Sequence, residues 1–436
     1  MSEIILTKDQ EYAVGAINSW YNRDDSKQVF TLAGYAGCGK SFLIKYIVDH
    51  VLNLDQLNIK YVAPTGKAAT VLIQKELPAT TIHKLIYTVN TIVEDILQPD
   101  GTKVRKKKVV FTKREKLCAT IKLIIVDEVS MVNKKLMEDL LSYDIKVLAV
   151  GDIGQLPPIG ESHGYLKDPD AVLEEPVRFE LENPIVKLAT EIRQGKPLPI
   201  GRYSDNVHIY YRNQLSPYVI DSLLLNAEQV LCGRNNTRIS LNKRYRELKY
   251  NSVENNIQHN EKLICLHNNW SLELEEYFLV NGMSVYVTDA TESDNLEDVF
   301  IINCYPDFLS SLDLFEGIPI YKKSLNAVLE DKTKTVVYRL PDGDFVKMGK
   351  PPKREDESED EYRDRLRYIM KYRNEYAEEQ LNYFDYGYAI TVHKSQGSEW
   401  DRVLLFAENI MRTREDYIKW LYTAITRTKE KLVIII

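Results

Sequence analysis

"GYAGCGKS" (residues 34–41) matches GxxxxGK[ST], the pattern of a phosphate-binding loop. The apolar run "VFTL" (29–32) precedes this stretch, and the helical-looking "FLIKYIVDHV" (42–51) follows it. A strand, a glycine-rich loop and a helix in this order allow backbone N–H groups and the helix N-terminus to surround a phosphate. The sequence therefore predicts a P-loop within an α/β domain.

The P-loop pattern predicts a function for its fixed lysine and serine positions. Lys40 would reach the β- and γ-phosphates, and the Ser41 hydroxyl would bind Mg²⁺. The expected nucleotide contacts are Gly34, Ala36, Gly37, Cys38, Gly39, Lys40, Ser41 and Phe42. Kinases, switches, transporters and motors all contain such a loop, so it predicts binding of ATP or GTP but leaves the purpose of hydrolysis open.

Two adjacent carboxylates complement the loop. In "LIIVDEVSM" (123–131) four apolar residues run directly into Asp127 and Glu128. At a strand end, Asp127 would hold Mg²⁺ directly or through water, and Glu128 would polarise the attacking water. A plain surface pair of acids is the alternative, but a buried strand downstream of a P-loop favours the catalytic interpretation. Mg²⁺-dependent hydrolysis of a nucleoside triphosphate is therefore predicted.

The bulk composition excludes several other classes of protein. The 436 residues are enough for two or three domains, and 44% of them are hydrophobic. No apolar stretch approaches the roughly 20 residues that span a bilayer, and "MSEIILTKDQ" lacks the features of a signal peptide. The five cysteines are scattered without a CxxC pair, which argues against disulfides and a zinc site and predicts a cytoplasmic protein.

The formal net charge of −7 would disfavour a nucleic-acid partner if the total charge were the relevant quantity. At physiological salt, charges interact over only about 8 Å, so a phosphate backbone responds to local patches. One such patch, "KVRKKKVVFTKREK" (103–116), contains eight basic residues and the single acid Glu115. Nucleic-acid binding therefore stays open.

Short apolar strands alternate with helical stretches in the first part of the chain, as in an α/β domain with a mainly parallel sheet. "IKLIIVDEVS" (121–130) and "IKVLAVGDIGQ" (145–155) have the pattern of buried parallel strands that end in polar residues. Because chemistry in such sheets gathers at the carboxyl ends of the strands, these polar residues are expected to share one site.

Two segments interrupt this alternation. Residues 91–111 contain two β-runs around the turn "QPDG" and predict a projecting hairpin. Residues 251–380 include an "NG" pair at 281–282, which predicts another hairpin, and a strongly charged stretch with helical spacing. Strand character returns at "YGYAITVHKSQG", "RVLLF" and "KLVIII". The middle region is therefore expected to be an insertion in a second α/β domain.

The order of these motifs resembles that of superfamily 1 DNA helicases, with the RecD-like and Dda-like group, superfamily 1B, as the nearest match. The similarity runs from residue 6 to the last residue, although residues 270–380 contribute little. It rests on "LTKDQEYAV" (6–14), "APTGKAA" (63–69), "ATTIHKL" (79–85), "GDIGQLPPIG" (151–160), "VRFELENPIVKLATEIRQG" (177–195), "VLCGRNNTRISLN" (230–242), "YAITVHKSQGSEWDRV" (388–403) and "LYTAITRTKEKLVI" (421–434).

This resemblance implies roles for further residues around ATP. Gln155 would sense the γ-phosphate, while Arg178 and Arg427 would reach across the cleft from the second α/β domain. An arginine in such a position contributes roughly 10³–10⁵ in rate to phosphoryl transfer. The additional nucleotide contacts implied are Gln10, at the adenine edge, and Gly397 and Glu399. Because the second domain shows no P-loop of its own, hydrolysis would depend on closure between the two domains.

The same resemblance implies a DNA track. The expected contacts are Pro64, Thr65, Thr80, Thr81, His83, Asn235, His393, Ser395 and Gln396. Small polar side chains suit contacts to phosphates, which contribute affinity without sequence information, while a purely structural role is the alternative for the two histidines. The hairpin lies where the family has its strand-separating pin. Its tip lacks an aromatic wedge, for which Pro99 could substitute, and a decorative surface hairpin is the alternative.

The implied fold is α/β, with two RecA-like P-loop domains that have parallel sheets, an inserted β-hairpin (1B) and an inserted β-rich and helical domain (2B). The expected boundaries are 1–170 for domain 1A, with the hairpin at 88–116, and 171–250 together with 381–436 for domain 2A. Residues 251–380 would form the 2B domain, SH3-like with an added charged helix.

The combined prediction is a DNA helicase that uses ATP and Mg²⁺ to translocate on single-stranded DNA, with the 5′→3′ direction implied by the family. A DNA-stimulated translocase that remodels protein–DNA complexes without processive unwinding is the alternative. A P-loop kinase or GTPase-like switch would need an acceptor lid or an NKxD motif, and the sequence has neither. Intact Lys40, Asp127 and Glu128 argue against an inactive DNA-binding scaffold.

The expected partners are single-stranded DNA and junctions between single-stranded and duplex DNA. A single-strand-binding or replisome protein is a further candidate partner. The expected setting is the cytoplasm of a bacterium or of a phage-infected host, with the monomer as the active form.

Overall fold

The computed structural model describes residues 6–97, 103–157, 164–177, 182–251, 256–274, 277–327, 336–339, 344–346, 353–354, 357–373 and 378–436. The chain folds into two compact units. The first consists of Met1–Thr88, Lys113–Arg238 and Ala389–Ile436, and the second of Val89–Thr112 and Ile239–Tyr388. No described helix combines the length and the apolar character of a membrane span.

The first unit contains a six-stranded sheet in which every strand is parallel to its neighbours. In spatial order the strands are β3 (Ala79–Thr81), β2 (Ile59–Ala63), β6 (Leu123–Val126), β7 (Lys146–Gly151), β1 (Val29–Gly34) and β8 (Ala171–Leu173). All four residues of β6 are buried, as its continuous apolar run predicts. The predicted parallel sheet around the P-loop is confirmed.

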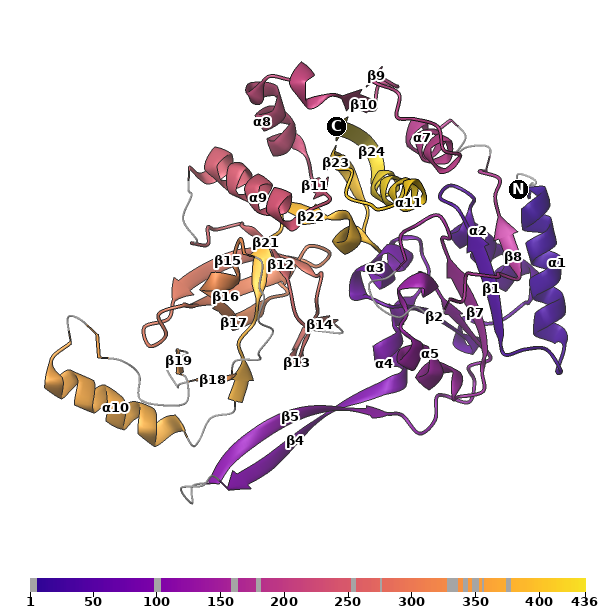
Figure 1. The fold of residues 1–436 in the computed structure, drawn as a ribbon. Coiled ribbons are helices and arrows are strands. Elements are labelled where there is room, and N and C mark those ends of the chain that lie inside the picture. The colour runs from indigo at the N-terminus through magenta and orange to yellow at the C-terminus, as the bar shows by residue number, and fades with distance from the viewer. Residues whose placement is uncertain are drawn as a thin grey trace. The chain divides into compact units, whose positions relative to one another are not determined.

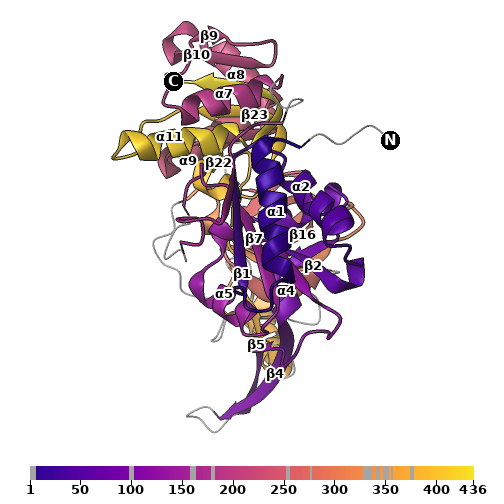
Figure 2. The same cartoon turned by 90° about the vertical axis from the view of Figure 1, so that its right-hand side faces the viewer.

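Helices cover both faces of this sheet, as Figure 2 shows for α1 and α5 on opposite sides of β1 and β7. One face packs against α1 (Lys8–Asn22), α2 (Lys40–Tyr46) and α3 (Gly66–Gln74), and the other against α4 (Ile82–Ile86) and α5 (Lys134–Leu141). The helix predicted for 42–51 begins at Lys40 and widens into a π-helical turn at Ile47–Val51. With both faces covered, the loops at the strand ends are left to form the site.

A second sheet lies in the same unit, with strands in the order β22 (Ala389–Thr391), β11 (Gln229–Cys232), β23 (Trp400–Phe406), β24 (Thr428–Ile435), β10 (Val207–Tyr210) and β9 (Gly201–Arg202). Its neighbours are parallel except for β9, which runs antiparallel to β10. The accompanying helices are α7 (Pro184–Arg193), α8 (Pro217–Asn226) and α11 (Arg414–Ile425), while α9 (Asn235–Tyr250) begins in this unit and continues in the second. Figure 1 shows α11, in yellow, beside α7, and the two helices are in contact.

The predicted hairpin is present as β4 (Tyr87–Leu97) paired with β5 (Lys103–Lys113). Its turn and Pro99 lie outside the described residues. Two parallel sheets, a hairpin and a β-rich second unit together confirm the predicted fold class. The individual domain boundaries and the SH3-like character of the insertion stay predictions.

The second unit is built on an antiparallel sheet with the order β17 (Phe315–Tyr321), β16 (Val299–Pro306), β15 (Ser284–Glu292), β12 (Lys262–Cys265) and β21 (Phe384–Tyr386). Smaller strands are β13 (Asn269–Leu274) with β14 (Tyr277–Leu279), and β18 (Val336–Arg339) with β19 (Phe345–Val346) and β20 (Glu378–Gln380). The charged stretch forms α10 (Glu359–Arg373), as its spacing predicts.

The hairpin predicted from the "NG" pair at 281–282 is wrong. The strand before this turn, β14, pairs with β13, while the strand after it, β15, pairs with β12 and β16. Gly282 adopts a positive φ of 87°, and its N–H donates to the carbonyl of Cys265 at 2.9 Å. The turn therefore sends the chain onto β12 rather than back along β14.

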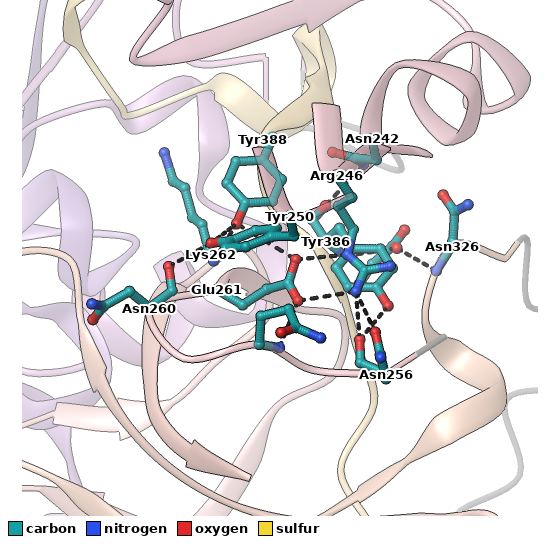
Figure 3. Close-up of polar contacts among 12 residues, drawn as sticks. Asn242, Arg246, Tyr250, Asn256, Asn260, Glu261, Lys262, Asn326, Tyr386 and Tyr388 are labelled. Carbon is teal, nitrogen blue, oxygen red and sulfur yellow. Dashed lines mark hydrogen bonds and ion pairs between the residues drawn. The ribbon is translucent and has the colours of Figure 1, made fainter. Parts of the chain in front are cut away.

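A buried ion pair joins α9 to the sheet of the second unit (Figure 3). The Nε of Arg246 lies 2.7 Å from Oε1 of Glu261, and their side chains are only 2% and 0% exposed. Such a pair is stable only when its remaining donors are also satisfied, and here Nη2 of Arg246 donates to both oxygens of Asn256. Asn242 donates to the carbonyl of Tyr386 in the same cluster, so α9 is fixed to β21.

Candidate functional site

The phosphate loop connects β1 to α2, as its sequence predicts. Gly39 adopts the left-handed conformation with φ 73°, which only glycine adopts without strain. A Cβ atom at this position would lie 2.9 Å from Nε2 of Gln10, so a larger residue would also displace the support beneath the loop. The loop therefore needs glycine here for two independent reasons.

Gln10 supports the loop from α1. Its Oε1 accepts the N–H of Thr7 at 3.0 Å in a capping box, and its Nε2 donates to the carbonyl of Cys38 at 3.0 Å. The side chain is 1% exposed and does not line the pocket described below. In this arrangement Gln10 holds the shape of the loop, and its contact with adenine stays a prediction.

A pocket of about 270 Å³ lies above the loop. Twelve predicted site residues line it: Ala36, Gly37, Gly39, Lys40, Ser41, Phe42, Asp127, Glu128, Gln155, Gly397, Glu399 and Arg427. Gly34 and Cys38 do not, because Gly34 belongs to β1 and the Cys38 side chain is fully buried beneath the loop. Arg178 lies outside the described residues.

Lys40 is folded back over the loop. Its Nζ donates to the carbonyls of Gly34 and Tyr35, both at 2.9 Å, and lies 3.9 Å from Oδ2 of Asp152. These contacts hold the ammonium group against the backbone of the loop. A phosphate that enters the loop would therefore meet a cation that is already in place.

Asp127 and Glu128 follow β6, the strand next to β7, and line the pocket with Lys40. Glu128 adopts a left-handed φ of 50°, and its Oε2 is buried without a hydrogen-bond partner. Burial raises the pKa of the Asp127 carboxyl. Burial and the neighbouring Asp127 raise the pKa of Glu128 to about 7, against the opposing influence of Arg427 and Lys40. Glu128 is thus a carboxylate with an unused acceptor and a raised affinity for a proton.

The oxygen donors of Ser41 and Asp127 line one pocket, and hydroxyl and carboxylate oxygens are the ligands that Mg²⁺ prefers. The buried Oε2 of Glu128 has no hydrogen-bond partner, so the pocket contains a further oxygen that a bound group can contact. The residues present therefore fit a divalent cation beside the phosphate loop.

Arg427 reaches the same pocket from the second sheet, where it lies between α11 and β24. Its Nε donates to the carbonyl of Thr423 at 3.1 Å, and its Nη1 donates to the carbonyl of Ser398 at 3.2 Å. The side chain is 3% exposed, and its charge lowers the pKa of Glu128. Residues of both sheets therefore enclose one site.

The pocket also contains residues that the sequence analysis missed, namely Tyr35, Ala68, Val71, Lys75, Gly151, Asp152 and Thr426. Asp152 is the most informative of these. Its Oδ1 accepts the N–H of Gly154 at 2.8 Å, and its Oδ2 accepts Nε2 of Gln155 at 3.4 Å. The sequence contains a signal for Asp152, because this residue directly follows the apolar run of β7, as Asp127 follows that of β6.

Comparison with known proteins agrees with this combination of motifs. Residues 6–214 match a family model described as an AAA domain, and residues 386–435 match one described as a UvrD-like helicase C-terminal domain. The chain is 30% identical over 192 residues to the ATP-dependent DNA helicase Dda of Enterobacteria phage T4. It is 32% identical over 178 residues to the ATP-dependent RecD2 DNA helicase of Deinococcus radiodurans. In these regions the chain is similar to ATP-dependent DNA helicases.

Both alignments cover 39% of this chain, and they span 39% of Dda and 22% of RecD2. The chain therefore matches well under two thirds of the length of these relatives. Among solved structures, the Pif1 helicase from Bacteroides, in complex with ADP-AlF3 and ssDNA, aligns with 99% of this chain and 92% of its own, with a TM-score of 0.46 and 18% identity.

Two threonines predicted for the DNA track cap helices at strand ends of the first sheet. The hydroxyl of Thr65 accepts the N–H of Ala68, and that of Thr81 accepts the N–H of Lys84, both at 3.2 Å. Pro64 and Thr80 are half-buried next to them. His83 lies on α4, where burial lowers its pKa and so favours the neutral imidazole.

The second sheet provides the other predicted track residues. His393 lies in the 3-10 turn Val392–Ser395, and Gln396 donates to the carbonyl of Leu156 at 2.7 Å. Ser395 is 0% exposed and donates to the carbonyl of Val392, so the structure does not offer its hydroxyl to a DNA strand. Asn235 is exposed at the start of α9. A Cβ atom on Gly397 would lie 3.6 Å from Oγ1 of Thr65, so the two motifs approach each other closely.

Proposed function

We propose that the chain is a DNA helicase that couples ATP hydrolysis to translocation on single-stranded DNA. The observation that supports this most directly is the pocket that is lined both by Lys40, on the helix after β1 of the first sheet, and by Arg427, just before β24 of the second sheet. A group that contributes to catalysis from a second sheet makes hydrolysis sensitive to how the sheets are placed. Hydrolysis can then drive movement of one sheet against the other.

Different residues of the chain bind the phosphates, activate the water and stabilise the developing charge. The N–H groups of Gly37–Ser41 and the Lys40 ammonium group bind the phosphates, and Glu128 orients the attacking water and accepts its proton. Gln155 and Arg427 stabilise the charge that develops on the transferred group. Ser41 and Asp127 would hold Mg²⁺, which when bound neutralises charge on the phosphate oxygens.

The role of Glu128 leads to a specific expectation. Glu128→Gln keeps the size of the side chain but removes its basicity, so kcat should fall by roughly 10²–10⁴-fold while ADP affinity changes little. Stopped-flow phosphate release and calorimetric ADP titration measure the two quantities. Glu138→Gln on α5, whose side chain is exposed and paired with Lys134, is the matched control. A Glu128→Gln variant with at least a tenth of the normal kcat would contradict the assignment.

The proposed DNA track runs over the strand ends of both sheets and uses Thr65, Thr81, His83, His393 and Gln396. Its support is the close approach of Gly397 to Thr65 and the position of Thr65 and Thr81 at helix N-termini, where N–H groups favour phosphate. The basic second strand of the hairpin, β5, adds positive charge that suits a junction between single-stranded and duplex DNA.

Strand displacement with matched tailed duplexes tests direction and function together. We expect unwinding of a duplex with a 5′ single-stranded tail and little unwinding of one with a 3′ tail. A 5′→3′ motor reaches the duplex only when it loads on a single-stranded 5′ tail. ATP hydrolysis should be stimulated by single-stranded DNA in the same preparations. DNA-stimulated hydrolysis without displacement of either duplex would favour the remodelling translocase, and unwinding only from 3′ tails would refute the subgroup direction.

A further inference from the structure

Tyr422 on α11 forms contacts across the two sheets that the proposed mechanism does not use. The tyrosine is 1% exposed, and its hydroxyl accepts the N–H of Ala36 in the phosphate loop at 2.6 Å. The same hydroxyl donates to Oδ2 of Asp152 at 2.9 Å. Burial and then Asp152 keep the pKa of Tyr422 well above its ordinary value, so the hydroxyl keeps the proton that it donates.

The ring of Tyr422 is held independently of its hydroxyl. It packs edge-on against Tyr35 with ring centroids 6.3 Å apart. A Cβ atom on Gly154 would lie 2.8 Å from Cε1 of Tyr422, so the loop after β7 leaves space for this ring and no more. Because the ring has its own contacts, removal of the oxygen alone tests the hydrogen bonds.

The next residue, Thr423, connects the same helical turn to Arg427. Its hydroxyl accepts the N–H of Leu156 at 2.8 Å, and its carbonyl accepts Nε of Arg427 at 3.1 Å. One turn of α11 therefore contacts the phosphate loop through Tyr422, contacts the loop after β7 through Thr423, and anchors the arginine that faces the pocket. A shift of the phosphate loop must be transmitted to this turn or break its hydrogen bonds.

We propose that Tyr422 is a positioning residue that fixes the phosphate loop to the helical turn that anchors Arg427. This inference rests on the proposed ATPase function. Through its hydroxyl, Tyr422 joins Ala36 to Asp152, the carboxylate that also lies 3.9 Å from Lys40 and accepts Gln155. The hydroxyl thus keeps the loop, Asp152 and the turn that anchors Arg427 in one arrangement, which matters for chemistry more than for nucleotide affinity.

Tyr422→Phe tests this directly, since it leaves two buried polar groups short of one partner each and preserves the ring. We expect kcat for ATP hydrolysis to fall about tenfold and ADP affinity to change less than about threefold. Without nucleotide, hydrogen exchange at the Ala36 amide should become faster, because its acceptor is gone. Tyr417→Phe is the matched control, because its ring stacks on Trp420 in the same helix, away from the phosphate loop.

Retained ADP affinity shows that the variant is folded, so a loss of kcat then reports on positioning. Repeating the change in an Arg427→Lys background adds a second test: if Tyr422 acts through Arg427, the loss there should shrink to less than about twofold. A kcat within about twofold of the parent protein, an unchanged Ala36 exchange rate, or an equal loss in both backgrounds would overturn the inference. If the parent protein itself fails to hydrolyse ATP, the proposed function fails instead.

Discussion

Lys40→Ala is expected to reduce ATP hydrolysis by more than roughly 10³-fold and to weaken nucleotide binding at the same time. The Lys40 ammonium group is the cation of the phosphate loop, held by the carbonyls of Gly34 and Tyr35. Without it, only the uncharged N–H groups of the loop face the phosphates, while the carboxylate of Asp152, which lies 3.9 Å from the Lys40 ammonium group, remains to repel them. Binding and chemistry should therefore both suffer.

Phosphate release at saturating ATP and single-stranded DNA measures the rate, and a fluorescent ADP analogue measures the affinity. Lys45→Ala provides a matched control, because Lys45 lies on the same helix but pairs with Glu76 at the surface. The control should keep full activity, since exposed ion pairs contribute little to stability. Turnover by Lys40→Ala within about tenfold of the parent rate would remove the P-loop assignment.

The parts of the site that the sequence predicts are those set by local geometry. The order of strand, glycine-rich loop and helix places Lys40 and Ser41 without reference to the rest of the chain, and an apolar run that ends in acids places Asp127 and Glu128. These four residues line one pocket, as the parallel-sheet argument requires. Arg427 is placed by its motif and by the strand that follows it.

The features that the sequence does not predict depend on which group a side chain or strand contacts in the folded chain. Gln10 uses its amide to hold the carbonyl of Cys38 rather than to face the pocket, a choice made by the packing of α1 against the loop. The "NG" turn is another example. Gly282 supplies the positive φ of a turn, but the sheet decides which strand pairs next, and β15 pairs with β12.

The contacts of Tyr422 are also not predicted by the sequence, and they join residues that lie far apart in the chain. The motif that contains Tyr422 indicates only that Arg427 reaches the nucleotide. A tyrosine in a buried helix is ordinarily a core residue, so the sequence does not single out Tyr422. The hydrogen bonds to Ala36 and Asp152 appear only once the two sheets are placed together. Contacts of this kind join residues hundreds of positions apart, and no local pattern encodes them.

Arg427→Ala is expected to lower kcat by roughly 10³–10⁵-fold, the range for loss of an arginine that stabilises the transition state of phosphoryl transfer. Unlike Lys40→Ala, it should leave ADP affinity nearly unchanged. Arg427 is anchored to the carbonyls of Thr423 on α11 and of Ser398 just before β23, and it contributes no part of the phosphate loop that holds the nucleotide. Its charge acts on the group that is transferred, which ADP lacks.

Calorimetric ADP titration beside single-turnover hydrolysis separates these two effects, and Arg412→Ala, in an exposed loop of the same sheet, controls for the loss of one positive charge. Comparison of Lys40→Ala with Arg427→Ala tests whether hydrolysis is coupled to movement. If Lys40→Ala loses binding while Arg427→Ala loses only chemistry, the first sheet holds the nucleotide and the second decides when it is cleaved. A kcat for Arg427→Ala within about tenfold of the parent value would mean that Arg427 does not stabilise the transition state, and the proposed coupling of hydrolysis to movement through this arginine would fail.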